Sequence, residues 1–207
     1  FTKNRHCESQ LIMTTHDLLS RLDRKDMVDV AVLDFSKAFD TVPHRRLMNK
    51  LRLYGIEGKT HAWINCFLRG RTQSVVVGGR RSHGPGATAG DPVISGVPQG
   101  TVLGPVLFLL YINDLPGVLS PGTVCRLYAD DCLIYRSIRS NQDQLTLQAD
   151  LASLHEWSAM WGLSFNVSKC SMLHIARQVE NPCRFYTLGG EGIKSKGEAA
   201  SLGVKLS

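Results

Sequence analysis

The sequence predicts an α+β fold of about one large domain. Helix-type and strand-type apolar patterns both occur along its 207 residues, without the regular alternation of a βαβ protein. A composition of 43% apolar and 20% charged residues excludes a disordered chain, a collagen-like repeat and a coiled coil. The longest apolar stretch, 102–112, falls short of the ~20 residues that cross a bilayer, so we expect no membrane partner.

The first part of the chain is expected to hold three helices and one buried strand. Apolar residues recur at helical spacing over 8–22. The segment 26–33 alternates and then becomes continuously apolar, which is typical of a strand that becomes buried along its length. Further helices are predicted at 45–54 and 60–68, the first ended by a glycine.

The middle and the end of the chain contain loops, two helices and short strands. A short strand is predicted at 73–77, and the glycines and prolines of 78–100 predict a long loop. An almost wholly apolar body makes 101–115 a buried helix. Leucine and tryptophan spacing predicts a long helix over 141–162, and 163–207 shows the pattern of short strands.

Three acidic residues occupy positions where an acid is costly. Asp34 follows a buried strand, and Asp130 and Asp131 separate two apolar runs, 124–129 and 132–138, that predict a tight hairpin. A buried carboxylate needs a partner, and no Lys or Arg lies within two residues of the Asp pair. A divalent cation, Mg²⁺ above all, would relieve the repulsion between adjacent carboxylates. The alternative is a solvated Asp-Asp turn with Asp34 capping the next turn.

The net charge of +6 is concentrated in one part of the chain. Between 44 and 81 there are nine Lys or Arg residues and one acid, Glu57. Such a basic field favours binding of a polyanion that weakens with salt, and the alternative is a solvated helix face. The six cysteines show no metal-ligand spacing, so we expect reduced, mostly buried thiols, an intracellular protein and no structural metal site.

Three segments in this order resemble motifs A, B and C of a reverse transcriptase. They are Val32 to Asp40, Ser95 to Pro105, and Tyr128 to Asp131. The sequences of these motifs are most similar to those of non-long-terminal-repeat (LINE-type) retrotransposons of the jockey-like kind. The resemblance covers nearly the whole chain, and three long motifs in register are far more specific than any one alone.

The resemblance implies a two-metal site. Asp34 and Asp130 would hold two Mg²⁺ ions, for which Mn²⁺ is a possible substitute, with Asp131 assisting and the Phe35 carbonyl as a further ligand. One ion would lower the pKa of the primer 3′-hydroxyl, and the other would neutralise the triphosphate and the leaving pyrophosphate.

The resemblance also implies a set of nucleotide-binding residues. The backbone amides of Phe35 and Ser36 would meet triphosphate oxygens. Phe39 would lie beneath the incoming sugar and clash with a 2′-hydroxyl, and ordinary core packing is the alternative for this ring. Gln99 and Gly100 would lie against the template base and the incoming nucleotide, where glycine allows close backbone approach.

Weaker matches extend the resemblance to both ends. Lys169 would protonate the departing pyrophosphate as general acid, or be an ordinary surface lysine. Leu202 and Gly203 would belong to the hairpin that contacts the primer end, although Ser201 replaces the usual aromatic residue. Arg5 would reach the triphosphate from the end of a fingers motif.

The implied fold is a polymerase palm, an antiparallel sheet backed by helices, with partial fingers and no thumb. Residues 1–25 and about 42–95 would form fingers and palm helices and a loop, and 26–41 with 96–207 the palm. The implied partners are an RNA template, a DNA primer, deoxynucleoside triphosphates and the remainder of a parent polyprotein, including endonuclease and thumb. The compartment would be the nucleus or cytoplasm, as a ribonucleoprotein, without secretion.

Three other functions remain open from the sequence. An RNA-dependent RNA polymerase shares the metal-binding acids, but Phe39 and the Tyr-Ala before Asp130 argue against it. A carboxylate-metal nuclease has no use for the loop 95–100. A catalytically silent RNA-binding remnant would result if truncation had removed what the reaction needs.

Overall fold

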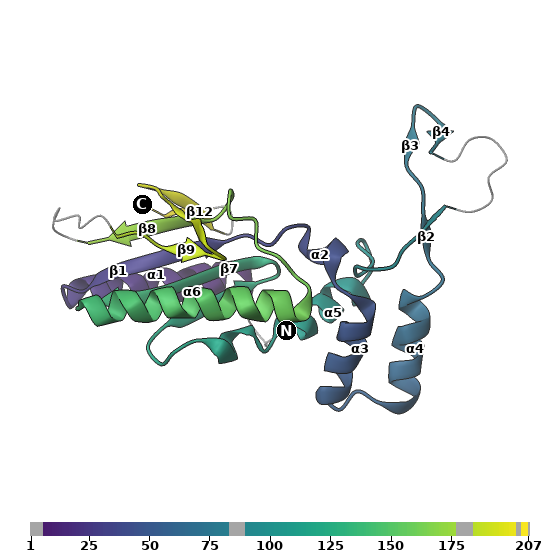
Figure 1. Cartoon of the computed structure of the whole chain (residues 1–207), viewed down its shortest axis with the longest axis horizontal. Coiled ribbons are helices and arrows are strands. Elements are labelled where there is room, and N and C mark those ends of the chain that lie inside the picture. The colour runs from purple at the N-terminus through teal and green to yellow at the C-terminus, as the bar shows by residue number, and fades with distance from the viewer. Residues whose placement is uncertain (1–5, 83–89, 177–183, 202–203, 207) are drawn as a thin grey trace. The chain divides into compact units, whose positions relative to one another are not determined.

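The computed structural model describes residues 6–82, 90–176, 184–201 and 204–206 (Figure 1). The chain divides into two compact units, one formed by Phe1–Ala38 with Ile112–Ser207 and the other by Phe39–Tyr111. Along the described residues, no helix combines the length and the apolarity needed to cross a membrane. The assignment of residue ranges to fingers and palm stays a prediction.

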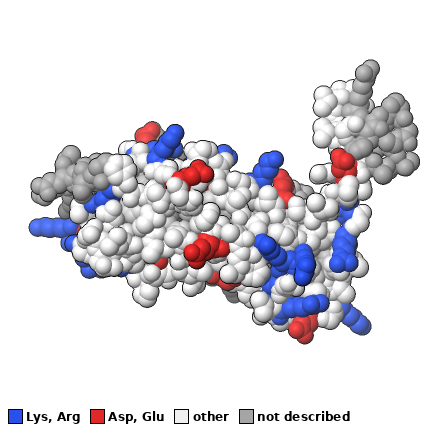
Figure 2. Space-filling model, in the orientation of Figure 1, with Lys and Arg blue, Asp and Glu red and all other residues white. Residues whose placement is uncertain are grey.

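The unit formed by 39–111 is mainly helical. Its helices are α2 (Ala38–Thr41), α3 (His44–Leu53), α4 (Gly58–Leu68) and α5 (Leu103–Ile112), which begin and end within two residues of the predicted bounds where a helix was predicted, except that α5 ends three residues early. The buried side chains of α3 and α4 follow helical spacing, with Leu47 and Leu51 on one helix and Ile64 and Leu68 on the other. Lys and Arg side chains gather over α3 and α4 (Figure 2).

Two short hairpin-like ladders lie between α4 and α5. Strand β2 (Thr72–Gln73) pairs with β5 (Asp91–Pro92), and β3 (Val76–Val77) pairs with β4 (Arg80–Arg81). The prediction of one strand over 73–77 is therefore wrong, because Gln73 and Val76, three positions apart, pair with different partners. Apolar content indicates where a strand forms but not which segment it pairs with.

The other unit is built on a five-stranded sheet in the order β11-β8-β1-β7-β6. The strands are β6 (Val124–Tyr128), β7 (Asp131–Ile138), β1 (Met27–Leu33), β8 (Ser171–Ile175) and β11 (Lys194–Ser195). The central strand β1 pairs antiparallel with both β7 and β8, whereas β11 runs parallel to β8. The residues of β1 are buried on both faces of the sheet, which explains why the predicted strand 26–33 is almost continuously apolar.

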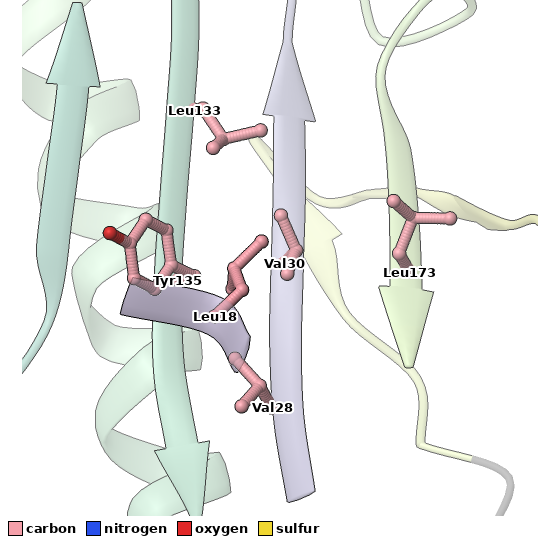
Figure 3. Packing of buried hydrophobic residues seen from close by; sticks show 6 residues of the cluster. All are labelled: Leu18, Val28, Val30, Leu133, Tyr135 and Leu173. Atoms are coloured by element: carbon pink, nitrogen blue, oxygen red, sulfur yellow. The ribbon is translucent and has the colours of Figure 1, made fainter. Parts of the chain in front are cut away.

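One face of this sheet packs against helix α1 (Cys7–Asp23). Alternate residues of β1, Val28 and Val30, point to this face, because successive side chains of a strand point to opposite sides. Figure 3 shows them beside side chains from α1 and the two neighbouring strands, namely Leu18, Leu133, Tyr135 and Leu173. This cluster is the main core on that side of the sheet.

The helix predicted over 8–22 forms, but its buried face differs from the apolar stripe. Ile12 and Leu19 are 69% and 55% exposed, whereas Gln10, Thr14 and Leu18 are buried. The Thr14 hydroxyl is satisfied because it donates to the Gln10 carbonyl at 2.8 Å. A short hydroxyl that bonds its own helix can be buried at low cost, so the helix face is set by packing rather than by apolarity alone.

The long helix α6 (Asn141–Trp161) packs against β7. Ser140 caps its first turn, since its hydroxyl accepts from the Asp143 amide and the Asp143 carboxylate accepts from the Ser140 amide. Gly162 ends the helix with a φ of 71° in the left-handed region. Both boundaries agree with the predicted helix.

The remainder of this unit consists of short elements, of which the strands after 163 were predicted. A 3₁₀ helix, η1 (Leu115–Val118), follows α5. Strand β9 (Thr187–Leu188) pairs with β10 (Glu191–Gly192), and β12 (Ala199–Ser201) pairs with β13 (Val204–Leu206).

Candidate active site

The strand register places Asp34 at the tip of the β6–β7 hairpin. Leu33, the last residue of β1, lies opposite Cys132 of β7. The next step along the two antiparallel strands brings Asp34 toward Asp131. On the other side of β7, Asp131 pairs with Tyr128. Positions almost a hundred residues apart in the chain therefore meet at one edge of the sheet.

The backbone of Asp34 is held by the segment that follows α6. Its carbonyl accepts a hydrogen bond from the Asn166 amide at 2.8 Å, and its own amide donates to the Cys170 Sγ at 3.4 Å. Two bonds to one short segment fix the peptide groups on both sides of the Asp34 side chain. The sequence had offered no sign that Asn166 and Cys170 position this residue.

The next two residues continue this pairing. The Ser36 amide donates to the Ser164 carbonyl at 2.8 Å, and the rings of Phe35 and Phe165 stack with centroids 4.4 Å apart. Phe35 and Phe165 form a non-hydrogen-bonded antiparallel pair, so the N–H and C=O of Phe35 point away from that segment. Because β7 is the neighbour on the other side of β1, these groups of Phe35 are directed toward the hairpin side.

One oxygen of the Asp34 carboxylate lacks a hydrogen-bond donor. Its Oδ1 is buried, and no described residue donates to it. The nearest cation is Lys169, whose Nζ lies 3.7 Å from that oxygen in an ion pair with both side chains partly exposed. An exposed ion pair of this length stabilises little, so the oxygen is left suited to a stronger cation.

The hairpin tip differs by one position from the predicted loop. Its two loop residues are Ala129 and Asp130, whereas Asp131 is already the first residue of β7 and pairs with Tyr128. The prediction of an Asp130–Asp131 loop was wrong. In the predicted and in the observed strand register, every side chain lies on the same face of the sheet, so the apolar pattern cannot distinguish the two registers. Ala129 has a φ of 52°, a conformation that costs a residue with a Cβ about 1–2 kcal/mol.

The carboxylate oxygens at this edge are of the type that a hard divalent cation prefers as ligands. Asp130 and Asp131 are exposed, and Asp34 contributes the buried oxygen without a donor. Within 6–82, 90–176, 184–201 and 204–206, no three His, Cys, Asp or Glu side chains lie together as a metal-binding group. The register unites the three positions, and the role of their carboxylates as ligands stays a prediction.

Two thiols lie next to the candidate carboxylates. A hydrogen bond with Cys125 and complete burial raise the pKa of Cys132 well above its ordinary value. Burial also raises the pKa of Cys170, outweighing the opposite effect of the hydrogen bond from the Asp34 amide. Both thiols therefore stay protonated and unreactive near neutral pH. In the described residues every cysteine is a free thiol, but only Cys132 and Cys170 are buried, so the prediction of mostly buried cysteines is wrong.

In the 39–111 unit, the loop 95–100 is bound to the last residues of motif A. The Val97 amide donates to the Phe39 carbonyl at 2.7 Å, and the Ser95 hydroxyl donates to the Asp40 carbonyl at 2.9 Å. Gly96 has a φ of 90°, and a Cβ there would lie 2.8 Å from the Asp40 carbonyl oxygen. Only glycine permits this close approach.

The predicted nucleotide-binding residues of this unit have defined surroundings. Phe39 is half-buried and stacks on Phe108 with centroids 4.5 Å apart. Gln99 is exposed, and its side-chain amide donates to the Asp40 Oδ1 at 2.7 Å. Gly100 follows with a φ of 74° and open space around it. Asp40, which positions Gln99, was not singled out from the sequence.

Three predicted site residues, Arg5, Leu202 and Gly203, lie outside the described residues. The prediction that the Ser36 amide meets a triphosphate also has a condition attached. That amide is engaged with the Ser164 carbonyl, so such a contact requires this bond to be exchanged.

A buried charged cluster on β1 was missed by the sequence analysis. Asp29 is fully buried and accepts from Arg184 twice at 2.8 Å, from the Tyr186 hydroxyl at 2.6 Å and from His174 at 2.9 Å. Burial alone would raise the pKa of Asp29, but the hydrogen bonds from His174, Arg184 and Tyr186 outweigh it and lower the pKa. An acid in the middle of the apolar run 28–33 was the available signal.

Comparison with known protein families agrees with this geometry. A family model described as reverse transcriptase (RNA-dependent DNA polymerase) matches residues 2–206. Two similar proteins are the RNA-directed DNA polymerase from mobile element jockey of Drosophila funebris, 29% identical over 95% of this chain, and the probable RNA-directed DNA polymerase from transposon X-element of Drosophila melanogaster, 33% identical over 79%. This chain covers 21% and 18% of their lengths.

Two more comparisons concern a further element and the fold. A retrovirus-related Pol polyprotein from the R2 retrotransposable element of Popillia japonica is 28% identical over 91% of this chain, which covers 32% of that protein. A solved telomerase structure from Candida tropicalis matches with a TM-score of 0.58 and 13% identity, over 90% of this chain and 31% of that one. The last likeness concerns the fold alone, and it supports the predicted α+β palm.

Proposed function

Because this chain belongs to the reverse transcriptase family, we propose that it carries the catalytic site of an RNA-directed DNA polymerase of a non-LTR retrotransposon. The observation that supports this most is the register of β1 and β7, which brings position 34 to the hairpin that carries Asp130 and Asp131. The substrates would be an RNA template, a DNA primer and deoxynucleoside triphosphates. The remainder of a longer polyprotein would complete the enzyme.

Asp34 and Asp130 would hold Mg²⁺, with Asp131 assisting. The buried Asp34 Oδ1 without a donor and the Phe35 carbonyl directed to the hairpin side support this assignment. When bound, two such ions lower the pKa of the primer 3′-hydroxyl and neutralise charge on the triphosphate. Mn²⁺ has the same preference for oxygen ligands and would be a substitute.

Lys169 would donate a proton to the departing pyrophosphate. Its ammonium is held by the Asp34 carboxylate at 3.7 Å, and its side chain is 64% exposed. A long exposed side chain can leave this pair at little cost when a more negative group arrives. The backbone amides of Phe35 and Ser36 would bind triphosphate oxygens, the latter after exchange of its bond to Ser164.

Phe39, Gln99 and Gly100 would form the part of the site that recognises the nucleotide. Stacking on Phe108 limits the rotamers of Phe39, so its ring can exclude a ribose hydroxyl by contact. The bond from Gln99 to Asp40 fixes the side-chain amide next to the open backbone of Gly100.

Primer extension tests the proposal. The chain is given a poly-ribonucleotide template, an annealed DNA primer, deoxynucleotides and Mg²⁺, and we expect extended primer. The variant Asp130→Asn should lose extension while its affinity for RNA stays within about threefold, since a metal ligand is removed but the basic surface is intact. Glu156→Gln, which neutralises an exposed acid on α6, is the matched control and should extend normally.

Two results would count against the proposal in different ways. Extension that survives in Asp130→Asn would show that the metal assignment is wrong. A wild-type chain that binds the template but never extends the primer would identify the catalytically silent RNA-binding alternative.

A further inference from the structure

Helix α4 and the turn after it carry a row of aromatic and basic side chains, in which Phe67 is half-buried and the others are exposed. We call Lys59, Trp63, Phe67 and Arg71 the α4 stripe. Trp63 is 59% exposed, and its ring stacks with Phe67 at a centroid distance of 6.1 Å. The Arg71 guanidinium lies over the Phe67 ring, 5.4 Å from its centroid. The row therefore runs from a cation through two aromatic rings to a second cation.

The local structure explains how the stripe is assembled. Lys59, Trp63 and Phe67 are spaced by four residues, which places them on one face of the helix. Ile64 and Leu68, each one position after a ring of the stripe, are buried, so the adjacent face of α4 supplies the core contacts. After the helix ends at Leu68, Gly70 with a φ of 68° turns the chain, and Arg71 lies back over Phe67.

Neither stability nor ordinary surface composition explains this arrangement. A buried tryptophan contributes a large apolar area to a core, but Trp63 contributes much less because the residue is 59% exposed. Basic residues are common near the C-terminus of a helix, which explains the position of Arg71. It does not explain why the ring of Trp63 is exposed. A stacked pair of rings with a cation on it is the kind of surface that contacts planar groups.

The charge around the stripe identifies the class of its partner. The sequence between 44 and 81 holds nine cations and one acid. One of the nine, Lys50, is buried and donates to the Tyr111 carbonyl, so it is not available to a ligand. Exposed Lys and Arg side chains remain over these helices (Figure 2). The exposed cations of α3, α4 and the following turn are Arg45, Arg52, Lys59, Arg69 and Arg71.

We propose that the α4 stripe binds unpaired RNA, with a base stacked on Trp63 and phosphates contacted by Lys59 and Arg71. Single-stranded nucleic acid is the polyanion that offers planar faces and phosphates at short intervals, whereas a duplex hides its base faces. An acidic protein would satisfy the cations without using the exposed rings. The choice of RNA rests on the proposed function, in which the template is the unpaired strand.

Binding of a short labelled oligouridine to the 207-residue chain tests the proposal. Fluorescence anisotropy is measured without Mg²⁺ or nucleotides, so catalysis does not enter. Trp63→Ala should weaken binding about tenfold, because one stacked base is lost. Trp63→Phe keeps an aromatic face and should stay within about threefold of wild type. Phe185→Ala is the matched control, an aromatic residue of the other unit that is 78% exposed, and should bind like wild type.

The salt dependence separates the stacking contact from the phosphate contacts. Lys59→Ala should lower the slope of log affinity against log salt by about 0.7, the value for one phosphate of a single strand. Trp63→Ala should leave that slope unchanged. RNA should also quench the fluorescence of Trp63, the most exposed of the three tryptophans, and Trp63→Phe should remove this quenching while binding continues.

Several outcomes would overturn the proposal. In the first, Trp63→Ala binds oligouridine like wild type. In the second, Trp63→Ala loses as much affinity for an RNA–DNA duplex as for oligouridine. A third is a Trp63→Ala variant that changes only the sedimenting mass, which would make the stripe a contact between copies. In the Asp130→Asn background, Trp63→Ala should weaken oligouridine binding by the same factor. The binding result can therefore be interpreted even if the chain has no polymerase activity.

Discussion

Asp34 combines a tightly held backbone with a carboxylate that is incompletely satisfied. Asn166 and Cys170 bind its peptide groups, whereas Oδ1 is buried without a donor in the described residues. An acceptor buried in this way costs about 1–3 kcal/mol. Such local costs, like the positive φ of Ala129 at the hairpin tip, are found where a site needs a group in a set position.

Sugar selection is a residue-scale prediction. Phe39→Val removes the ring but keeps an apolar, β-branched side chain, so ribonucleotides should be admitted alongside deoxyribonucleotides. The measurement is the ratio of ribo- to deoxynucleotide incorporation in primer extension. Phe108→Leu, which removes the ring that stacks on Phe39, should shift this ratio in the same direction to a smaller extent. An unchanged ratio in Phe39→Val would assign the ring to core packing alone.

At the scale of elements, β1 has two different roles along its length. Its C-terminal end leads to Asp34, and its middle binds the segment 184–186 through Asp29. Arg184 and Tyr186 precede β9, and His174 lies on β8, so one carboxylate joins three parts of this unit. Such a cluster is costly to build, because each charge must leave water, and very costly to break once built.

The Asp29 cluster predicts a large loss of stability on neutralisation. Asp29→Asn leaves the Arg184 guanidinium buried without its counter-charge, so the free energy of unfolding at pH 7 should fall by about 3–5 kcal/mol. Denaturant unfolding followed by circular dichroism is the measurement. Glu156→Gln should change this free energy by less than about 0.5 kcal/mol, as expected for an exposed residue. A loss in Asp29→Asn no larger than in this control would contradict the prediction.

The pH dependence of that difference has a definite sign. The pKa of Asp29 is lowered in the folded chain, so the unfolded chain binds the proton more readily. The stabilisation is therefore complete above the unfolded pKa of about 4 and is lost as the pH falls through the lower, folded pKa. The difference between wild type and Asp29→Asn should shrink as the pH falls below about 4.

At the scale of the whole molecule, the chain forms two units with different kinds of order. The 1–38 and 112–207 unit has a central strand that is paired on both edges and buried on both faces. In the 39–111 unit, the described strands between α4 and α5 form ladders of only two residues each, and Val75 to Val77 are exposed. Backbone hydrogen bonds in such exposed ladders open easily.

Hydrogen exchange should reproduce this division. The amides of β1 and β7 should exchange slowest, since they open only with the sheet. Those of Val76 and Val77 should exchange at least about a hundredfold faster, because local opening exposes them. Mass spectrometry or NMR of the wild-type chain is the measurement, and equal protection of the two regions would contradict this account of the 39–111 unit.

Much of this architecture could be predicted from local pattern. Helical spacing of apolar residues or long apolar runs predicted the helices and the long strand, and the Ser140 and Gly162 boundaries have their own capping chemistry. The three motif acids could be singled out because acids beside apolar runs are rare. The hairpin loop and the strand at 73–77 were predicted at the wrong positions, because the local apolar pattern does not show which segment a strand pairs with.

The sequence by itself determined the class of fold, the order of the elements and the family, since these follow from periodicity and from motifs read along the chain. Only the tertiary structure decided which groups meet: Asn166 and Cys170 on Asp34, Asp40 on Gln99, and Arg71 on Phe67. The physical reason is that hydrogen bonds and ring contacts depend on distance in space. Strand register and chain turns set that distance, and neither could be predicted from the neighbouring residues in the sequence.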